Sequence, residues 1–173
     1  ASPVITGSVD TPGYAKSVAV LDNYAYVADG YGSSCLHVID ISTPASPVIT
    51  GSVDTPSYAL GVAVLDNYAY VANGYWGLQV VDISTPASPS ITLSIDTPGY
   101  ASGVAVSGNY AYVADGSLGL QVIDISTPAS PVITGSVDTP GSAFGVAVSG
   151  NYAYVADWTS GLQLAKRQCE PGS

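Results

Sequence analysis

The chain has 173 residues, of which 47% are hydrophobic, and this suits one domain with a substantial core. Charged residues make up 9%, and 13 acidic residues against 3 lysines and arginines give a net charge of −10, which excludes the basic surface that nucleic acids or anionic membranes require. No apolar run reaches the roughly 18 residues of a membrane-spanning helix, so we expect no membrane span.

The sequence repeats itself four times. ASPVITGSVDTP begins at Ala1, Ala45 and Ala129, and the related ASPSITLSIDTP begins at Ala87. The first interval is two residues longer than the others, because residues 29–40 read DGYGSSCLHVID where the second repeat reads NGYWGLQVVD. Insertions of this kind belong in loops.

Each repeat predicts four short strands. In chain order they are PVITGSV, ending at DTP; SVAV or GVAV, ending at LDN or SGN; YAYVA, ending at DG or NG; and LQVVDI, ending at STPASP. Valine, isoleucine, threonine and tyrosine favour strands, while proline, glycine, asparagine and aspartate favour turns. No segment has a helical period over ten residues, so the chain is predicted to be all-β.

Four strands in a repeat of about 42 residues are typical of one β-propeller blade. Small side chains in the SVAV and GVAV segments would let these strands crowd around a central axis; they are Ala19, Gly61, Ala63, Gly103, Ala105, Gly145 and Ala147. We therefore predict a β-propeller of four four-stranded blades in a single domain, residues 1–168, followed by a C-terminal tail, residues 169–173.

The two ends of the chain are complementary. The chain starts with an outermost strand that has no blade, and its last repeat ends as GLQLAKRQCEPGS, without such a strand. We expect residues 1–10 to complete the last blade beside residues 161–167, closing the ring and removing two exposed edges. Because the same hydrogen bonds could join two chains, four blades in one chain, an eight-bladed pair and an open assembly all remain open.

Residues 103–141, GVAVSGNYAYVADGSLGLQVIDISTPASPVITGSVDTPG, resemble the LVIVD-type repeat of bacterial and archaeal cell-surface proteins. The resemblance covers nearly the whole chain. It implies a propeller that is secreted or held at the cell surface, in a family whose function is mostly unassigned, and it implies no catalytic residue. The tail departs from the repeat, since Lys166 replaces the aspartate found at Asp40, Asp82 and Asp124.

Aspartates recur at fixed places in the repeat. Those before the ISTPASP turn (Asp40, Asp82, Asp124) and those that begin DTP (Asp10, Asp54, Asp96, Asp138) are interpreted as turn formers. We expect the DTP aspartates to share one strongly negative face with Asp29, Asn73, Asp115 and Asp157. Because no D-x-D-x-D-G loop is present, we predict neither a metal site nor a cofactor.

Histidine and cysteine give no catalytic signature. The single histidine, His37, takes the place of Gln79, Gln121 and Gln163, and no nucleophile elbow or phosphate loop accompanies it, so we predict that the protein is not an enzyme. Cys35 and Cys169 are expected at opposite ends of neighbouring blades, and a disulfide between them would require the tail to fold back.

The loops that follow YAYVA differ in large residues: Tyr31, Trp76, Leu118 and Trp158. Aromatic rings stack on sugars and on cationic groups, so the candidate ligand-binding residues are Tyr31, Trp76 and Trp158, with Asn73, Asp115 and Asp157 as polar anchors. The sequence predicts an extracellular or cell-surface module for binding or adhesion to a glycan, peptide or protein. The alternative is a structural subunit of an extracellular assembly or fibre that self-associates through its terminal strands. A further alternative is that both tryptophans simply cover the blades beneath them.

Overall fold

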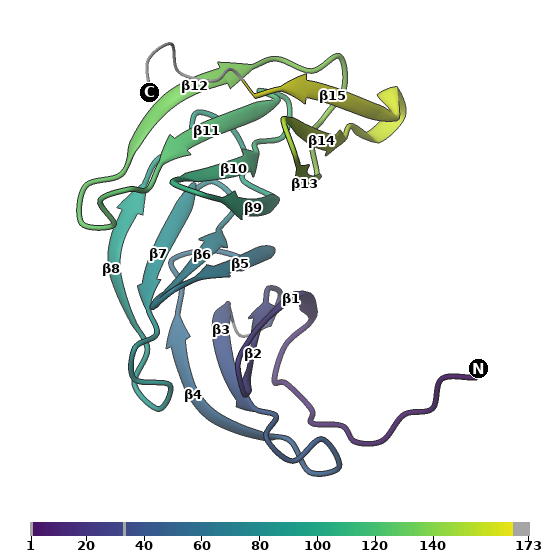
Figure 1. Cartoon of the computed structure of the whole chain (residues 1–173), viewed down its shortest axis with the longest axis vertical. Coiled ribbons are helices and arrows are strands. Elements are labelled where there is room, and N and C mark those ends of the chain that lie inside the picture. The colour runs from purple at the N-terminus through teal and green to yellow at the C-terminus, as the bar shows by residue number, and fades with distance from the viewer. Residues whose placement is uncertain (1, 33, 168–173) are drawn as a thin grey trace.

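The computed structural model describes residues 2–32 and 34–167. These residues form four antiparallel sheets, in which the strands are hydrogen-bonded in chain order. Figure 1 shows the sheets standing side by side along an arc, with the first strand of each on the inner side and the last strand on the outer side. The all-β fold of four propeller blades is thus confirmed.

Three of the blades have four strands and the last has three. Blade 1 contains β1 (Ala15–Leu21), β2 (Tyr24–Asp29), β3 (Cys35–Asp40) and β4 (Val48–Asp54). Blade 2 contains β5 (Gly61–Leu65), β6 (Tyr68–Ala72), β7 (Leu78–Asp82) and β8 (Ser90–Ile95). Blade 3 contains β9 (Gly103–Ser107), β10 (Tyr110–Ala114), β11 (Leu120–Asp124) and β12 (Val132–Val137). Blade 4 contains β13 (Gly145–Ser149), β14 (Tyr152–Ala156) and β15 (Leu162–Lys166), with a 3-10 helix, η1 (Trp158–Ser160), before β15.

Local sequence explains the strand ends. The turn between the first and second strands has a residue with positive φ, which is aspartate at Asp22 and Asp66 and glycine at Gly108 and Gly150. At the STP turns, the Oδ1 atoms of Asp40, Asp82 and Asp124 each accept an N–H bond of 2.8 Å from the serine two residues later. The hydrogen bonds from these serines lower the pKa of all three carboxyls. Their interpretation as turn formers is confirmed.

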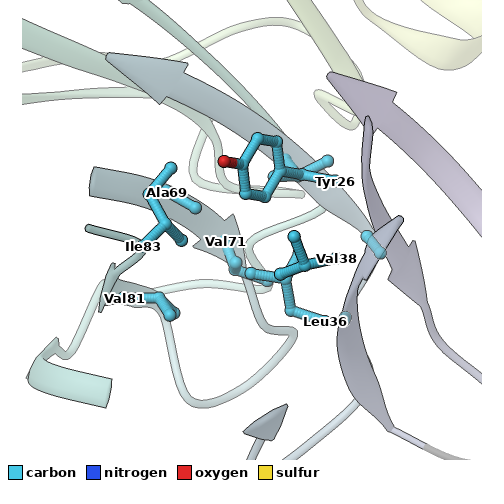
Figure 2. Packing of buried hydrophobic residues seen from close by; sticks show 10 residues of the cluster. Tyr26, Leu36, Val38, Ala69, Val71, Val81 and Ile83 are labelled. Atoms are coloured by element: carbon cyan, nitrogen blue, oxygen red, sulfur yellow. The ribbon is translucent and has the colours of Figure 1, made fainter. Parts of the chain in front are cut away.

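The hydrophobic core lies between the blades. Figure 2 shows the first of these layers, where Tyr26, Leu36 and Val38 of blade 1 face Val71, Val81 and Ile83 of blade 2. Tyr70, Leu78 and Val80 of blade 2 make the corresponding cluster with Val113, Ile123 and Ile125 of blade 3. Blade 3 repeats the pattern with Tyr112 and Leu120 against Ala153 and Val155 of blade 4. The repeated tyrosine, leucine and valine of each blade therefore form one side of the next layer.

The structure corrects the predicted closure of the ring. Residues 2–14 form no strand, and β15 is the edge of a three-stranded sheet, so residues 1–10 do not complete blade 4 of their own chain. Neighbouring first strands pack together from β1 to β5, β9 and β13, but β13 and β1 do not meet in this way, and Figure 1 shows an opening between them. The intrachain pairing fails because the arc keeps its two ends apart.

The described part of the chain contains no helix with the length and hydropathy of a membrane span. Residues 169–173, predicted as a C-terminal tail, lie outside the described residues. The prediction about a disulfide between Cys35 and Cys169 lies outside them as well, because it involves Cys169. Cys35 is buried, and its Sγ donates to Asp54 Oδ1 at 3.0 Å.

Candidate ligand-binding face

One face of the arc is formed by the loops between the second and third strands together with the turns that enter each blade. We call it the loop face; it comprises residues 29–32, 34, 73–77, 115–119 and 157–161 and the entry turns 10–14, 54–60, 96–102 and 138–144. Backbone hydrogen bonds join the loop of one blade to the entry turn of the next. Gly74 exchanges two such bonds with Ala101, both 3.0 Å, and Gly116 exchanges two with Ala143, of 3.1 and 2.9 Å. The loop face is therefore continuous across the blade boundaries.

Asp115 and Asp157 lie beneath this face and hold its entry turns. Asp115 Oδ1 accepts from the Thr97 hydroxyl at 2.6 Å and Oδ2 accepts from the Gly99 N–H at 2.9 Å. Asp157 makes the same pair of bonds, to Thr139 at 2.6 Å and to Gly141 at 2.9 Å. Burial raises the pKa of Asp115, and the two hydrogen bonds oppose this rise.

Asn73 and Asp29 occupy the equivalent positions in blades 2 and 1. Asn73 Oδ1 accepts from the Ser57 N–H at 3.0 Å, and its Nδ2 donates to the Ser57 carbonyl at 2.6 Å. Asp29 Oδ2 accepts from the Gly13 N–H at 2.8 Å. All four side chains are fully buried. The predicted polar anchors Asn73, Asp115 and Asp157 therefore serve the turns, and their polar atoms do not face solvent.

His37 lies inside blade 1 beside one of these carboxylates. Its Nε2 is 3.2 Å from Asp29 Oδ2, and both side chains are buried. The glutamines at the same position in the other blades instead donate to the carbonyl three residues earlier: Gln79 to Trp76, Gln121 to Leu118 and Gln163 to Ser160. His37 thus occupies a buried polar position that carries a loop contact in every other blade.

The aromatic candidates are at the surface. Tyr31, Trp76 and Trp158 are 39%, 53% and 71% exposed. Three loops each carry an aromatic ring that contacts an aromatic ring of an entry turn. Tyr31 lies 4.2 Å from Tyr58, Tyr75 lies 4.7 Å from Tyr100, and Phe144 lies 6.1 Å from Trp158, measured between ring centroids. In the first two pairs the entry turn belongs to the next blade, and in the third it belongs to the same blade.

Two of these pairs belong together. The Tyr31–Tyr58 pair lies beside the Tyr75–Tyr100 pair. Burial of Tyr100, together with its neighbour Tyr31 and a hydrogen bond between them, raises the pKa of Tyr100 to about 12. We call these four residues the aromatic patch. The ammonium of Lys16 lies 4.9 Å from the centroid of the Tyr31 ring, so one edge of the patch already holds a cation. Among the described residues, Trp158 makes a ring contact with Phe144 and none with the aromatic patch, so it does not join Tyr31 in one cluster.

Sequence reasoning missed Tyr58, Tyr75, Tyr100 and Phe144. The signal was present in the entry turns, where DTPGY, DTPSY and DTPGY place a tyrosine four residues after the aspartate, at Tyr14, Tyr58 and Tyr100. A tyrosine repeated from blade to blade is expected in the core, and only the fold shows that Tyr58 and Tyr100 contact aromatic rings of the loops.

The loop face also carries acidic groups that are open to solvent. The DTP aspartates Asp10, Asp54, Asp96 and Asp138 are all exposed. Within residues 2–32 and 34–167, no three histidine, cysteine, aspartate or glutamate side chains gather in a way that could hold a metal ion.

Comparison with known families identifies the repeat. The LVIVD repeat matches residues 12–55, 56–97, 98–139 and 140–164, four consecutive copies that cover most of the chain. The chain belongs to the LVIVD repeat family. The LVIVD repeats coincide with the blades, each beginning at an entry turn of the loop face. No curated protein matches the chain.

Solved structures share the fold of this LVIVD-repeat chain. The computationally designed Ika8 protein is 14% identical with a TM-score of 0.70, and the match covers 88% of this chain and 45% of that chain. The designed Ika4 protein is 15% identical with a TM-score of 0.70, covering 97% and 100%. A functionally unknown protein from Desulfotomaculum acetoxidans is 16% identical with a TM-score of 0.75, covering 95% and 55%. The LVIVD-repeat chain therefore spans about half the length of two of these three proteins.

Proposed function

We propose that this LVIVD-repeat protein is a non-enzymatic module for binding or adhesion, secreted or held at the cell surface, and that a neutral glycan is its ligand. The observation that carries the proposal is the aromatic patch, in which three exposed tyrosine rings from blades 1 and 2 gather around the half-buried ring of Tyr100 from blade 3. Monomeric proteins rarely expose such clusters without a binding role.

The chemistry of the patch favours a neutral ligand. Tyrosine and tryptophan rings stack on the C–H faces of sugars, and their polar atoms remain available for hydroxyl groups. Tyr75 and Trp76 are 78% and 53% exposed, so their rings can take such a ligand without rearrangement of the core. The net charge of −10 and the exposed DTP aspartates would repel acidic polysaccharides and nucleic acids.

The two buried carboxylates beneath the loop face, Asp115 and Asp157, are not suited to hydrolysis. Glycoside hydrolysis needs two carboxyl groups that flank the scissile bond. Asp115 and Asp157 are fully buried, and both oxygens of each accept a hydrogen bond from an entry turn. Neither is placed to reach a sugar on the patch.

The test is a glycan array followed by titration of tryptophan fluorescence with the strongest neutral oligosaccharide. Tyr75→Ala and Tyr58→Ala should each weaken binding by about tenfold, because each removes one stacking ring. Tyr152→Ala is the matched control: Tyr152 is exposed to the same degree as Tyr58, both 40%, but lies at the start of β14, at the other end of the strand from the loop face. Absence of any glycan signal, or equal losses in all three variants, would refute the glycan proposal. A peptide or protein ligand whose affinity falls in the same two variants would replace the ligand class but keep the face.

A second candidate is a structural subunit of an extracellular assembly. It is favoured by the unpaired edge at β15, where Leu162 and Leu164 are 61% and 57% exposed. An exposed apolar edge strand is a template for pairing with another chain. The two candidates are compatible, because β15 and the aromatic patch lie on different parts of the arc.

A further inference from the structure

The N-terminal segment, residues 2–9, lies where the outer strand of a preceding blade would lie. Its sequence is identical to that of residues 46–53, which lead into and form most of β4. A Cβ atom added at Gly51 would lie 2.3 Å from the carbonyl oxygen of Pro86, in the turn of the next blade. A Cβ atom added at Gly7 would meet the carbonyl oxygen of Pro44 in the same way, at 2.1 Å. Both glycines therefore bring their strand against the STPASP turn of the blade that follows.

Val9 repeats the packing of Val53. Val53 packs on the layer between blades 1 and 2, which includes Ala69, Val71 and Val81. Val9 packs on a cluster made by the three residues at the same repeat positions one blade earlier, Ala25, Val27 and Ile39. At Gly7 and Val9 the segment therefore already makes the contacts of an outer strand on blade 1, although it forms no strand itself and the inner strands of its blade are absent from the described residues on that side.

The inner side of blade 1 is incomplete in the same place. Val18 in β1 is 62% exposed, whereas Val62, its equivalent in β5, is 5% exposed because blade 1 covers it. The first strand of a preceding blade, equivalent to β13 of blade 4, would cover Val18. Blade 1 thus presents one half of a blade-to-blade contact that none of the residues in 2–32 and 34–167 occupies.

The other end of the arc shows the complementary defect. A cavity of about 730 Å³ lies between blades 3 and 4; its lining includes Tyr112, Leu120 and Val122 on one side and Leu164, Ala165 and Arg167 on the other. In the first layer, Ile83 and Ile91 pack on the equivalent Tyr26, Leu36 and Val38. Ile91 comes from the outer strand β8, and the described residues of blade 4 contain no equivalent of this strand.

Two residues that line this cavity differ from the repeat, and the smaller of them, Ala165, leaves room in it. Ala165 stands where blade 2 has Val81, and Arg167 stands where it has Ile83. Arg167 turns its guanidinium toward the Tyr112 ring, 5.4 Å from the centroid, and donates to Ser107 Oγ at 3.2 Å. The space left beside β15 matches an outer strand whose isoleucine points inward, and the repeat position of that isoleucine in residues 2–9 is Ile5.

We propose that two copies of this chain close one ring by exchanging these segments. Residues 2–9 of each copy form the outer strand on β15 of the other, and Ile5 enters the cavity between blades 3 and 4. The register follows from blade 3, where Leu120 faces Val137 and Asp124 faces Val132. Leu162 of one copy then faces Val9 of the other, and Lys166 faces Val4.

The exchange leaves no blade unfinished. In the described residues of each chain, the N-terminal segment has no strand partner and blade 4 has no fourth strand. These two features lie at opposite ends of the arc, so two chains related by a two-fold axis satisfy both. Pairing within one chain would require the segment to leave its contacts at Gly7 and Val9 and to cross the opening between β1 and β13 seen in Figure 1. This self-association is independent of the proposed glycan ligand.

Disulfide trapping tests both the register and the partner. The variant is Val9→Cys with Leu162→Cys, in a background of Cys35→Ser and Cys169→Ser, oxidised and run on a non-reducing gel. Facing residues of an antiparallel pair lie about 4.5–5.5 Å apart between Cα atoms, within disulfide range. The matched control, Val4→Cys with Leu162→Cys, places the thiols four residues apart along the strand, about 13 Å.

The expected result is a covalent dimer from the Val9 pair and no cross-link from the Val4 pair, with circular dichroism unchanged in both. A cross-linked monomer from the Val9 pair would overturn the proposal in favour of closure within one chain. Absence of a cross-link from the Val9 pair in folded protein, or equal cross-linking of the two pairs, would also overturn it.

Discussion

A buried carboxylate at the end of the second strand fixes the entry turn of its own blade. Asp115 does this with two hydrogen bonds to residues 16 and 18 positions earlier in the sequence, and Asn73 does it in blade 2 with an amide. In all four blades a side-chain oxygen accepts a backbone N–H of the entry turn; it is a carboxylate oxygen in three blades and an amide oxygen in blade 2. The requirement is a side-chain oxygen that accepts the backbone N–H of the turn, since an unsatisfied buried N–H is costly.

Replacement of Asp115 tests this role. Asp115→Ala should lower the free energy of unfolding by about 1–3 kcal/mol, because it leaves the Thr97 hydroxyl and the Gly99 N–H without their acceptor. Asp115→Asn should cost less, since the chain itself uses Asn73 at this position. Urea denaturation followed by fluorescence measures both. If the two variants lose the same stability, or if neither loses any, the carboxylate does not hold the turn.

Sequence alone could not assign these residues. Asp115 and Asp157 sit in DG and DW sequences that are typical of turns, and the prediction of ligand anchors rests on their closeness in sequence to the large loop residues. Their partners in the DTPG turns are distant in sequence and become adjacent only when the blade folds. The surface position of Tyr31, Trp76 and Trp158 was foreseen because loops that differ among near-identical repeats lie outside the shared core.

At the scale of the element, the repeat made the strands predictable. The β-branched and tyrosine-rich segments became the four strand types of each blade, and the turn residues became their ends. The exception is residues 3–9, predicted as a strand. The identical sequence is β4 in blade 1, so the difference lies in the partner: residues 35–40 pair with β4, whereas no strand in the described part of the chain pairs with residues 3–9. A segment forms a β-strand only where a neighbouring strand pairs with its backbone N–H and C=O groups.

Two neighbouring substitutions in this segment separate strand exchange from a free N-terminus. Val4 and Ile5 are 79% and 92% exposed in the single chain, so a charge at either would be harmless if the segment stayed free. In an outer strand the residue at Val4 stays exposed, as Val48 and Val132 do at 55% and 59%, whereas the residue at Ile5 turns toward the core, as Ile91 does. Ile5→Asp should therefore lower the melting temperature by more than about 5 °C, and Val4→Asp should leave it nearly unchanged.

Differential scanning calorimetry at one protein concentration compares the two variants with the parent chain. Both variants add one negative charge to the same segment, so net charge is matched. Equal melting temperatures for Ile5→Asp and Val4→Asp would mean that the segment does not dock on β15 of any chain.

For the whole molecule, blade count and blade order followed from the repeat, but the path of the arc did not. The angle between neighbouring blades is set by the packing of first strands and by residues such as Tyr26, Leu36 and Val38 in each layer, and small differences there decide whether four blades meet. The sequence predicts that the two ends of the chain pair, but it does not distinguish pairing within one chain from pairing between two chains. Two complementary defects at the ends of an open arc indicate a ring shared between chains.

Native mass spectrometry of the chain of residues 1–173 tests the shared ring most directly. Each chain has a mass of 17.4 kDa, and exchange of the N-terminal segments predicts a single species of twice that mass at micromolar concentration. A species of 17.4 kDa at every concentration, or a ladder of larger oligomers without a dominant dimer, would contradict closure of one ring by two chains.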